Sequence, residues 1–312
     1  MNNYLITGGA GFIGSNIVEE LVNQGQKVKV LDDFSTGKKE NLKQFSSAIE
    51  IIEGDIRNVN IVTQAMKGID YVLHQAALAS IPRSIKEPLR CNDVNVNGTL
   101  NVLLASREAG VKRVVYASSS SVYGDNPALP KVEEMNPKPK APYPAAKLAG
   151  EWYCRIFSKV YGLETVCLRY FNVFGPRQDP KSEYAAVIPK FIELMLKEKP
   201  PVIFGDGTQS RDFTFVKNVV HANLLAVQKK GISGKVFNIA CGNRHTLLEL
   251  VRILNEIMKK NITPVFLAER AADIKHSLAE INKAGEAFGY RPVIDFAEGL
   301  QKTIEYYSRK EG

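Results

Sequence analysis

A tyrosine and a lysine that stand four residues apart, Tyr143 and Lys147, have the clearest capacity for chemistry in this sequence. They lie in the stretch Ala-Pro-Tyr-Pro-Ala-Ala-Lys, downstream of a serine cluster at residues 118–121. On a helix, a separation of four residues places both side chains on one face, where an ammonium group favours an ionised phenol. Lowering a tyrosine pKa from ~10 to near neutrality needs about three units, or ~4 kcal/mol. A tyrosine tuned in this way is a general base at physiological pH.

A glycine-rich turn follows the first apolar segment. Residues 4–7 are typical of a short strand, and they lead into Gly8, Gly11 and Gly14 and then into an amphipathic segment at residues 17–21. A strand, a glycine turn and a helix in this order are the context of a dinucleotide-binding fingerprint. The glycines allow the pyrophosphate to approach backbone N–H groups at the positive end of the helix. Together with Lys147, the charge of an oxidised nicotinamide would supply the shift that Tyr143 needs.

The second predicted strand, residues 27–31, ends in Asp32 and Asp33. A carboxylate at this place meets the ribose hydroxyls of the adenosine and repels a 2′-phosphate, so the sequence predicts NAD over NADP. Asp55 follows a third strand, residues 49–52, where it would either hold the adenine amino group or cap its own loop.

Length and composition are those of a globular protein with a sizeable core. It has 312 residues and a formal charge of +8, but lysines and glutamates are interspersed, which indicates a solvated surface and not a nucleic-acid groove. No apolar run reaches the ~20 residues of a membrane span, so we expect a soluble, cytoplasmic protein. The four cysteines and four histidines show no metal spacing, and we expect no metal and no disulfides.

Strand and helix patterns alternate through the first half of the chain. Strands are expected at residues 4–7, 27–31, 49–53, 71–74, 113–117 and 165–169, and helices include 97–109 and 147–161. This alternation predicts an α/β fold with a doubly wound parallel sheet that binds its ligand at the carboxyl ends of the strands. Prolines loosen the pattern after Asn172, where a smaller substrate lobe is expected.

These motifs together resemble the extended short-chain dehydrogenase/reductase family. The resemblance rests on Thr7-Gly8-x-x-Gly11-x-x-Gly14, Asp55, residues 74–77, Asn95-x-x-Gly98-Thr99, Ser119 and Tyr143-x-x-x-Lys147. Residues 168–177, 205–207 and 210–213 look like its nucleotide-sugar branch, especially UDP-hexose 4-epimerases. The resemblance implies an NAD-binding Rossmann domain, residues 1–172 plus about 215–240. The nucleotide-sugar lobe would then take about 173–214 plus 241–312.

The resemblance also implies roles for individual residues. The catalytic set would be Ser119, Tyr143 and Lys147. NAD would contact Gly8, Gly11, Phe12, Ile13, Gly14, Asp32, Asp33, Ser35, Thr36, Gly37, Asp55, Ile56, Gln75, Ala76, Ala77, Tyr143, Lys147 and Phe171. The UDP-sugar would contact Ser80, Ser119, Ser120, Tyr143, Asn172, Val187, Val202, Ile203, Phe204, Arg211, Arg244, Arg270 and Ser277. For Arg211 and Arg270 a surface salt bridge is the alternative to a diphosphate contact.

Two positions bear on the reaction and the substrate. Related dehydratases carry an Asp-Glu pair at the positions of Ser120 and Ser121, and the lack of these carboxylates favours epimerisation. Ser277 matches a bulky tyrosine of epimerases restricted to plain hexoses, so we expect activity on UDP-N-acetylglucosamine and UDP-N-acetylgalactosamine, and less on UDP-glucose and UDP-galactose.

Three alternatives stay open at this point. A UDP-glucuronate 4-epimerase shares the serine-rich motif but needs a cation near the sugar C6. A non-catalytic dinucleotide-binding protein of this fold usually lacks the tyrosine or the lysine, and both are present here. By resemblance we expect a homodimer formed through the helices at 97–109 and 147–161, although their apolar residues would serve equally well as core.

Overall fold

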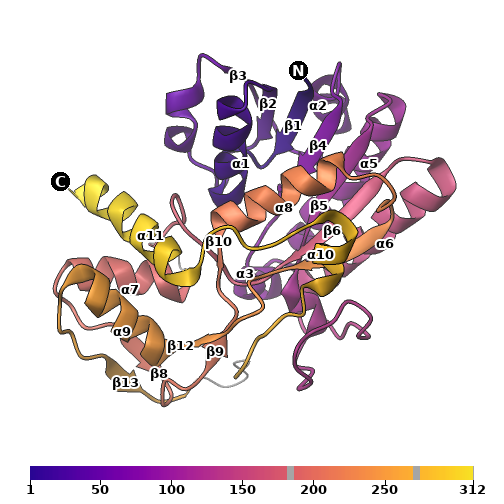
Figure 1. The fold of residues 1–312 in the computed structure, drawn as a ribbon. Helices are drawn as coiled ribbons and strands as arrows, with labels where there is room; N and C mark the ends of the chain where they lie inside the picture. Colours follow the sequence, from indigo (N-terminus) through magenta and orange to yellow (C-terminus); the bar gives the residue numbers. More distant parts are fainter. Residues whose placement is uncertain (181–185, 270–274, 312) are drawn as a thin grey trace.

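The computed structural model describes residues 1–180, 186–269 and 275–311. Its centre is a seven-stranded sheet with the strand order β11-β6-β5-β4-β1-β2-β3, in which every neighbouring pair is parallel (Figure 1). The strands are β1 (Asn3–Thr7), β2 (Lys27–Asp32), β3 (Ile49–Glu53), β4 (Tyr71–His74), β5 (Arg113–Ser119), β6 (Thr165–Tyr170) and β11 (Lys235–Ile239). The predicted fold class is confirmed.

Helices cover both faces of this main sheet. One core contains side chains from α1 (Phe12–Asn23), α8 (Val216–Gln228) and α10 (Asn282–Phe288). The other contains side chains from α2 (Val59–Ala65), α5 (Gly98–Glu108) and α6 (Pro142–Tyr161). A parallel sheet covered on both faces needs strands that are apolar throughout, and β6 accordingly is buried at all six positions.

The predicted bounds of helices α5 and α6 differ in accuracy. α5 agrees with the prediction, but α6 begins five residues earlier than expected, at Pro142. Proline fits the first helical turn because its missing N–H has no partner inside the helix there. The earlier start places Tyr143 on the same helix as Lys147.

Short helices connect β4 and β5. They are α3 (Ile81–Lys86), α4 (Pro88–Asn92) and a π-helical turn (Asp93–Asn97) that leads directly into α5. A single 3₁₀ turn (Ser120–Tyr123) follows β5, and two others (Lys39–Asn41 and Lys43–Phe45) follow β2.

A small lobe lies beside the carboxyl edge of the main sheet (Figure 1). Its helices are α7 (Val187–Leu196), α9 (Leu247–Met258) and α11 (Phe296–Glu311). Its strand pairs are β8 (Val202–Phe204) with β13 (Val265–Leu267), and β9 (Ser210–Arg211) with β12 (His245–Thr246); β7 (Val173–Phe174) pairs with β10 (Thr214–Phe215) at the junction. Phe174, Phe191, Leu254 and Leu300 share its core.

The division into two domains stays a proposal. β11 joins the main sheet beside β6, as the predicted return of the chain requires. Residues 282–290, which were assigned to the lobe, instead place Ala284, Phe288 and Tyr290 in the core around β11. The chain therefore returns from the lobe to the main sheet twice, at β11 and at residues 282–290.

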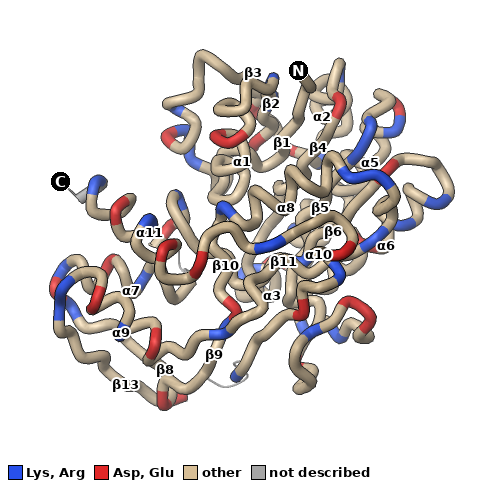
Figure 2. Tube along the Cα trace, in the orientation of Figure 1, with Lys and Arg blue, Asp and Glu red and all other residues tan. Residues whose placement is uncertain are grey.

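Charged residues of both signs are interspersed over the trace (Figure 2). Within the described residues, no helix is long and apolar enough to cross a membrane, and no three His, Cys, Asp or Glu side chains are grouped to hold a metal ion. All four cysteines are free thiols.

Candidate active site

Ser119 and Tyr143 meet at the carboxyl end of β5. Ser119 is the last residue of β5, and Tyr143 lies in the first turn of α6, where its backbone N–H donates to Ser84 Oγ at 3.1 Å. The Ser119 side chain lies close enough to Tyr143 to interact with its phenol. Ser119 Oγ also accepts from the hydroxyl of Ser121 at 2.9 Å. The structure thus brings together the two hydroxyl groups that were predicted to hold one substrate oxygen.

Lys147 lies one turn further along α6, with its side chain buried. Its Nζ donates to the carbonyl of Ala117 at 2.7 Å and stands 4.9 Å from the centroid of the Tyr116 ring. Burial lowers the pKa of Lys147 to about 8. The carbonyl of Ala117 on β5 therefore holds the Lys147 ammonium group in a fixed position.

The phenol of Tyr143 differs from the sequence expectation. Burial raises its pKa to about 12, and the interaction with Ser119 only partly opposes this rise. Lys147 does not contribute to the shift, because its ammonium group is directed at Ala117. The protein's own groups therefore keep Tyr143 protonated, and the expected lowering must come from the charge of what binds next to it.

A buried ion pair that sequence analysis missed lies next to this site. Arg169 on β6 donates from Nε and Nη2 to Glu151 on α6, at 2.8 and 2.7 Å, and both side chains are buried. Ser118 Oγ donates to the same carboxylate at 2.5 Å. Glu151 stands four residues after Lys147, so the helical repeat was the signal that could have found it. This pair links the catalytic helix to the two strands beside it.

The glycine turn has the geometry of a pyrophosphate cradle. Gly8 has a φ of +69°, which few residues other than glycine adopt. A Cβ on Gly14 would lie 2.1 Å from the carbonyl oxygen of Gly8, so no side chain fits. The N-cap of α1 is Gly11, which offers no side-chain cap and leaves the first N–H groups of the helix open to a ligand. These features fit a dinucleotide such as NAD.

Asp32 and Asp33 occupy different environments. Asp32 is buried and accepts backbone N–H groups from Ala10 and Phe34, both at 2.9 Å. Asp33 is exposed and accepts from the N–H and the hydroxyl of Ser35 at 2.9 and 2.7 Å. Asp32 thus braces the glycine turn itself, and the NAD-over-NADP preference stays a prediction.

Asp55 is engaged within its own loop. Its carboxylate accepts from the backbone N–H of Arg57 at 2.8 Å and from that guanidinium at 2.9 and 2.6 Å. The side-chain hydrogen bond from Arg57 lowers the pKa of Asp55. Of the two readings of this residue, loop capping is observed, and the adenine contact stays a prediction.

Most of the predicted cofactor residues, together with the predicted catalytic or substrate residues Ser119, Ser120 and Asn172, lie at the carboxyl ends of six neighbouring strands, whereas Tyr143 and Lys147 lie on α6. Gly8, Gly11, Phe12, Ile13 and Gly14 follow β1; Asp32, Asp33, Ser35, Thr36 and Gly37 follow β2; Asp55 and Ile56 follow β3; Gln75, Ala76 and Ala77 follow β4; Ser119 and Ser120 end or follow β5; Phe171 and Asn172 follow β6. Because the carboxyl ends of parallel strands share one edge, the fold gathers them there. Phe171 is an exception in one respect, since its side chain lies in a core cluster with Tyr123 and Ala279.

Three predicted substrate residues come together at the junction with the lobe. Asn172 Nδ2 donates to the carbonyl of Asp212 at 3.0 Å and lies 3.4 Å from Ser277 Oγ. Arg211, next to Asp212 on β9, donates from Nη1 to the carbonyls of Ser210 and Lys275 at 3.0 and 3.1 Å. These contacts place Arg211 and Ser277 on adjoining segments, beside Asn172.

Three positively charged side chains act on His276, the residue before Ser277. Burial lowers the pKa of His276, and the charges of Arg244, Lys275 and Arg211 lower it further. Ser210 Oγ lies 2.9 Å from Nδ1 of the same imidazole. Arg244 and Arg211 therefore belong to one positive region, which suits a diphosphate. Sequence reasoning did not identify His276.

The other predicted substrate residues are more dispersed. Val187 opens α7, and Val202 and Phe204 flank the buried Ile203 in β8. Ser80 is the N-cap of α3, where its hydroxyl accepts the N–H of Arg83 at 3.2 Å. Arg270 lies outside the residues that the structure describes.

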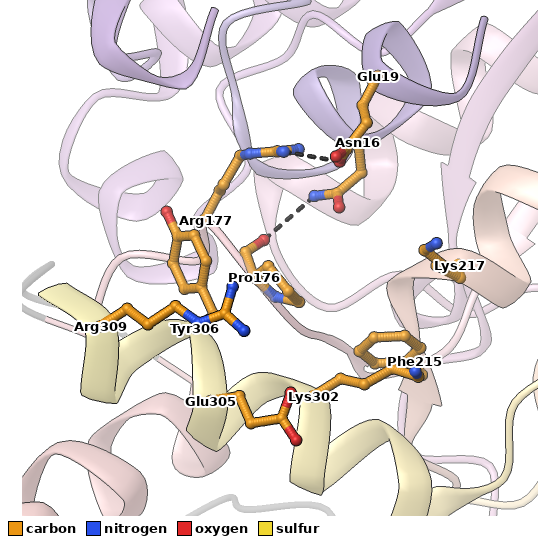
Figure 3. Close-up of a pocket in the computed structure, with 10 residues that line it drawn as sticks. All are labelled: Asn16, Glu19, Pro176, Arg177, Phe215, Lys217, Lys302, Glu305, Tyr306 and Arg309. Atoms are coloured by element: carbon orange, nitrogen blue, oxygen red, sulfur yellow. Dashed lines mark hydrogen bonds and ion pairs between the residues drawn. The ribbon is translucent and has the colours of Figure 1, made fainter. Parts of the chain in front are cut away.

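A groove of about 210 Å³ lies between α1, the segment after β7, the start of α8 and α11 (Figure 3). Its lining residues are Asn16, Glu19, Pro176, Arg177, Phe215, Lys217, Lys302, Glu305, Tyr306 and Arg309. Asn16 Nδ2 donates to the carbonyl of Pro176 at 3.1 Å, and Arg177 pairs with Glu19 at 2.6 Å. None of the predicted site residues lines this groove, which is a joint between α1 and the lobe.

Comparison with known proteins agrees with this geometry. The family model described as "NAD dependent epimerase/dehydratase family" matches residues 4–240. The chain belongs to this family. A UDP-glucose 4-epimerase of Mycolicibacterium smegmatis is 38% identical over 310 residues, 98% of each chain. The predicted family, the NAD cofactor and the epimerase type of enzyme are confirmed at this level.

Two solved structures of the epimerase/dehydratase family superimpose over nearly the whole chain. A UDP-N-acetylglucosamine 4-epimerase from Methanobrevibacter ruminantium, in complex with UDP-N-acetylmuramic acid, is 43% identical with a TM-score of 0.94 and covers 99% of both chains. A UDP-glucose 4-epimerase from Thermotoga maritima with UDP-glucose is 39% identical with a TM-score of 0.94, and the match covers 99% of this chain and 100% of that one.

Proposed function

We propose that this protein is an NAD-dependent UDP-sugar 4-epimerase that inverts C4 of UDP-N-acetylglucosamine and UDP-N-acetylgalactosamine, and to a lesser degree of UDP-glucose and UDP-galactose. The observation that carries the proposal is the placement of Ser119 beside Tyr143, with Lys147 one turn further along α6, next to a glycine turn whose backbone N–H groups fit a pyrophosphate. The family membership and the relatives described above support the reaction type.

The chain's own residues provide the acid–base part of this reaction. When bound, NAD supplies a hydride acceptor for C4 and a positive charge next to the phenol. Tyr143 removes the proton of the 4-hydroxyl and returns it after the ketone has been presented by its other face. Ser119 donates a hydrogen bond to the same sugar oxygen, and Lys147 adds a fixed positive charge behind the phenol.

The preference for acetylated sugars rests on Ser277. Its side chain is small and half-buried, and it lies 3.4 Å from the amide of Asn172, another predicted substrate residue. A serine leaves room for an N-acetyl group at C2, where a tyrosine would fill the same space.

The assembly is proposed to be a homodimer. Trp152, Ile156 and Val160 form one stripe along α6 and are 55%, 43% and 65% exposed. Ile85 and Leu89, on the adjoining helices α3 and α4, extend this apolar surface. A stripe of large apolar side chains on a long helix suits pairing with the same helix of a second copy across a twofold axis.

The test is an assay of the purified protein without added cofactor. UDP-N-acetylglucosamine and UDP-glucose are incubated separately and C4 inversion is followed by proton NMR; a parallel series contains added NAD. Inversion of the acetylated sugar at the higher rate is expected. Inversion of UDP-glucose alone would refute the substrate proposal but keep the mechanism. If neither sugar is inverted with NAD present, the epimerase proposal fails, and UDP-glucuronate is the next substrate to test.

A further inference from the structure

The carboxylate of Asp212 is fully buried and accepts three backbone N–H groups from two separate segments. Oδ1 accepts from Cys241 at 2.9 Å, and Oδ2 accepts from Gly242 at 3.0 Å and from Ala279 at 3.2 Å. Residues 241 and 242 follow β11 of the main sheet, whereas Ala279 belongs to the segment that carries Ser277. One side chain therefore holds two distant parts of the chain together.

The segment with Ser277, residues 275–280, is here called the strap. On one edge the strap bonds to the lobe: Ser210 N–H donates to Lys275 O and Ser277 N–H to Ser210 O, both at 3.0 Å. On the other edge it bonds to Lys131, which donates to Leu278 O at 2.8 Å and accepts from Glu280 N–H at 2.9 Å. Backbone bonds thus hold the strap between the lobe and the loop that follows β5.

The backbone of Asp212 joins the strap to the substrate residues. Its N–H donates to Ser277 O at 2.9 Å, and its carbonyl accepts the amide of Asn172 at 3.0 Å. The preceding residue, Arg211, donates to the strap at Lys275 O. Asp212 is therefore bonded to the strap through both its main chain and its side chain.

We propose that Asp212 is a positioning residue that fixes the strap, and so sets where Ser277, Asn172 and Arg211 meet the substrate. This inference rests on the proposed function and assigns no contact between Asp212 and the substrate. It gives the Ser-Arg-Asp-Phe motif at residues 210–213 a second role beside the predicted phosphate contact of its arginine.

A carboxylate suits this place better than an amide. All three partners of the Asp212 side chain are N–H donors, and an ionised carboxylate has only acceptor positions. An asparagine of the same shape would turn an NH₂ group toward at least one of these donors. Because a buried donor without an acceptor is costly, Asp212→Asn should loosen the strap while keeping the volume of the core.

The experiment compares Asp212→Asn with Asp70→Asn in the full-length protein. Asp70 is a matched control because its carboxylate also accepts a backbone N–H, from Asn3 at 2.8 Å, at the opposite end of the main sheet. Amide hydrogen exchange is measured on peptides that cover residues 241–242 and the strap, together with kcat and KM for UDP-N-acetylglucosamine and UDP-glucose. The melting temperature is recorded to choose conditions under which each variant is folded.

At pH 8, where Asp212 is ionised, we expect Asp212→Asn to raise exchange at Ala279 about tenfold or more and KM about tenfold, because at least one hydrogen bond to a charged acceptor is lost. kcat should stay within about threefold of the wild type, since Ser119 and Tyr143 lie on other segments, and the ratio of acetylated to plain turnover should change. Asp70→Asn should alter none of these values. A variant with a lower melting temperature but unchanged strap exchange, KM and selectivity would overturn the proposal.

Two further results keep the test decisive. If Asp212→Asn does not fold, Asp212→Glu keeps a carboxylate but displaces it by one methylene; the same changes in strap exchange, KM and selectivity are expected, and their absence counts against Asp212. If the wild type turns over no UDP-sugar, the proposed function fails, but the exchange data still decide whether Asp212 holds the strap.

Discussion

The carboxyl edge of the main sheet and the junction with the small lobe assemble their ligand-binding residues in different ways. At the sheet edge, each group of predicted residues follows one strand, and the parallel register brings the groups together. At the junction, Asn172, Arg211 and Ser277 come from three segments that share no regular sheet. Side-chain hydrogen bonds to backbone groups, chiefly those of Asp212, replace the register there.

This difference suggests a division of labour. Next to the reaction centre the sheet edge is firmly held, because β5 is buried over nearly its whole length and is paired with β4 and β6, which suits a reaction that needs accurate placement of Tyr143. The junction depends on a few hydrogen bonds and on one small side chain, and in the proposed function it is the part that selects the sugar. Changes at the sheet edge should therefore affect the rate of chemistry, and changes at the junction should affect substrate affinity and choice.

The largest effect is expected from Tyr143→Phe. Without the phenolic hydroxyl no group removes the proton of the 4-hydroxyl, and kcat should fall by ~10²–10⁴-fold, with KM nearly unchanged. Steady-state kinetics on UDP-N-acetylglucosamine measures this. Tyr161→Phe, the same change at an exposed position of the same helix, should keep the wild-type rate. If Tyr143→Phe retains more than about a tenth of wild-type kcat, Tyr143 is not the acid–base residue.

A loss of stability is expected from Glu151→Gln within the sheet half. The change leaves the charge of Arg169 buried without its partner, which costs ~3–5 kcal/mol of unfolding free energy. Glu256→Gln is the control, because Glu256 pairs with Arg252 and both side chains are exposed, so its loss should cost ~1 kcal/mol or less. Urea unfolding of both variants gives the comparison, and equal losses would show that burial is not the cause.

Ser277→Tyr should change selectivity without changing the chemistry. The larger side chain occupies the space proposed for the N-acetyl group, so kcat/KM for UDP-N-acetylglucosamine should fall about 10- to 100-fold, in line with the steric discrimination of enzyme pockets. Turnover of UDP-glucose in the same preparation is the internal control and should stay near its wild-type value. Unchanged acetylated turnover would remove the basis of the substrate proposal.

The two regions should also respond to pH in opposite directions. Burial lowers the pKa of His74, between Thr7 and Thr99 in the sheet half, to about 3. Below pH 6.5 the unfolded chain binds this proton more readily than the folded protein, so His74 makes stability fall by ~1.4 kcal/mol per unit as the pH drops toward 3.

Asp212 should change the pH dependence of folding stability in the opposite direction. Burial, opposed by its three backbone hydrogen bonds, raises its pKa from 3.8 to about 7. The folded protein holds this proton more tightly, so stability falls as the pH rises from about 4 to 7 and is constant above. Cys241 and Tyr290 face Asp212, and both have raised pKa values, so they stay neutral in this range.

Chemical unfolding between pH 4 and 8 measures both effects. His74→Gln should remove the loss of stability toward low pH, and Asp212→Asn should remove the loss of stability as the pH rises to about 7. Identical profiles for the two variants would contradict both assignments.

The sequence predicts the sheet half well because its signals are local. Six strands lie within two residues of their expected bounds, since each is an apolar run ended by glycine or a polar residue. The helix expected at 147–161 was bounded too late, although the spacing of Tyr143 and Lys147 already required a helical turn before Lys147, where the proline at 144 is tolerated. The rise of the Tyr143 pKa in the protein alone comes from burial, which no spacing reveals, and the lowering expected when a nicotinamide is bound stays a prediction.

The junction could be predicted only by resemblance. Strands β7, β9, β10 and β12 have two residues each, too few for any alternating pattern to appear. The partners of Asp212 are backbone N–H groups, which every residue except proline possesses, so no residue type marks them. Glu151 and Arg169 pair across 18 residues, and only the fold brings them together.

The strap has a consequence for how relatives of this protein can diverge and be re-engineered. Its bonds to the lobe and to Lys131 run through the main chain, so they place few demands on the side chains at residues 275–280. If Ser277 selects the sugar, exchanging this hexapeptide between family members, with the aspartate at 212 retained, should transfer that preference, because Ser119 and Tyr143 lie on other segments. Libraries of variants limited to residues 275–280 could therefore be screened for activity on other nucleotide sugars while the rest of the fold is kept.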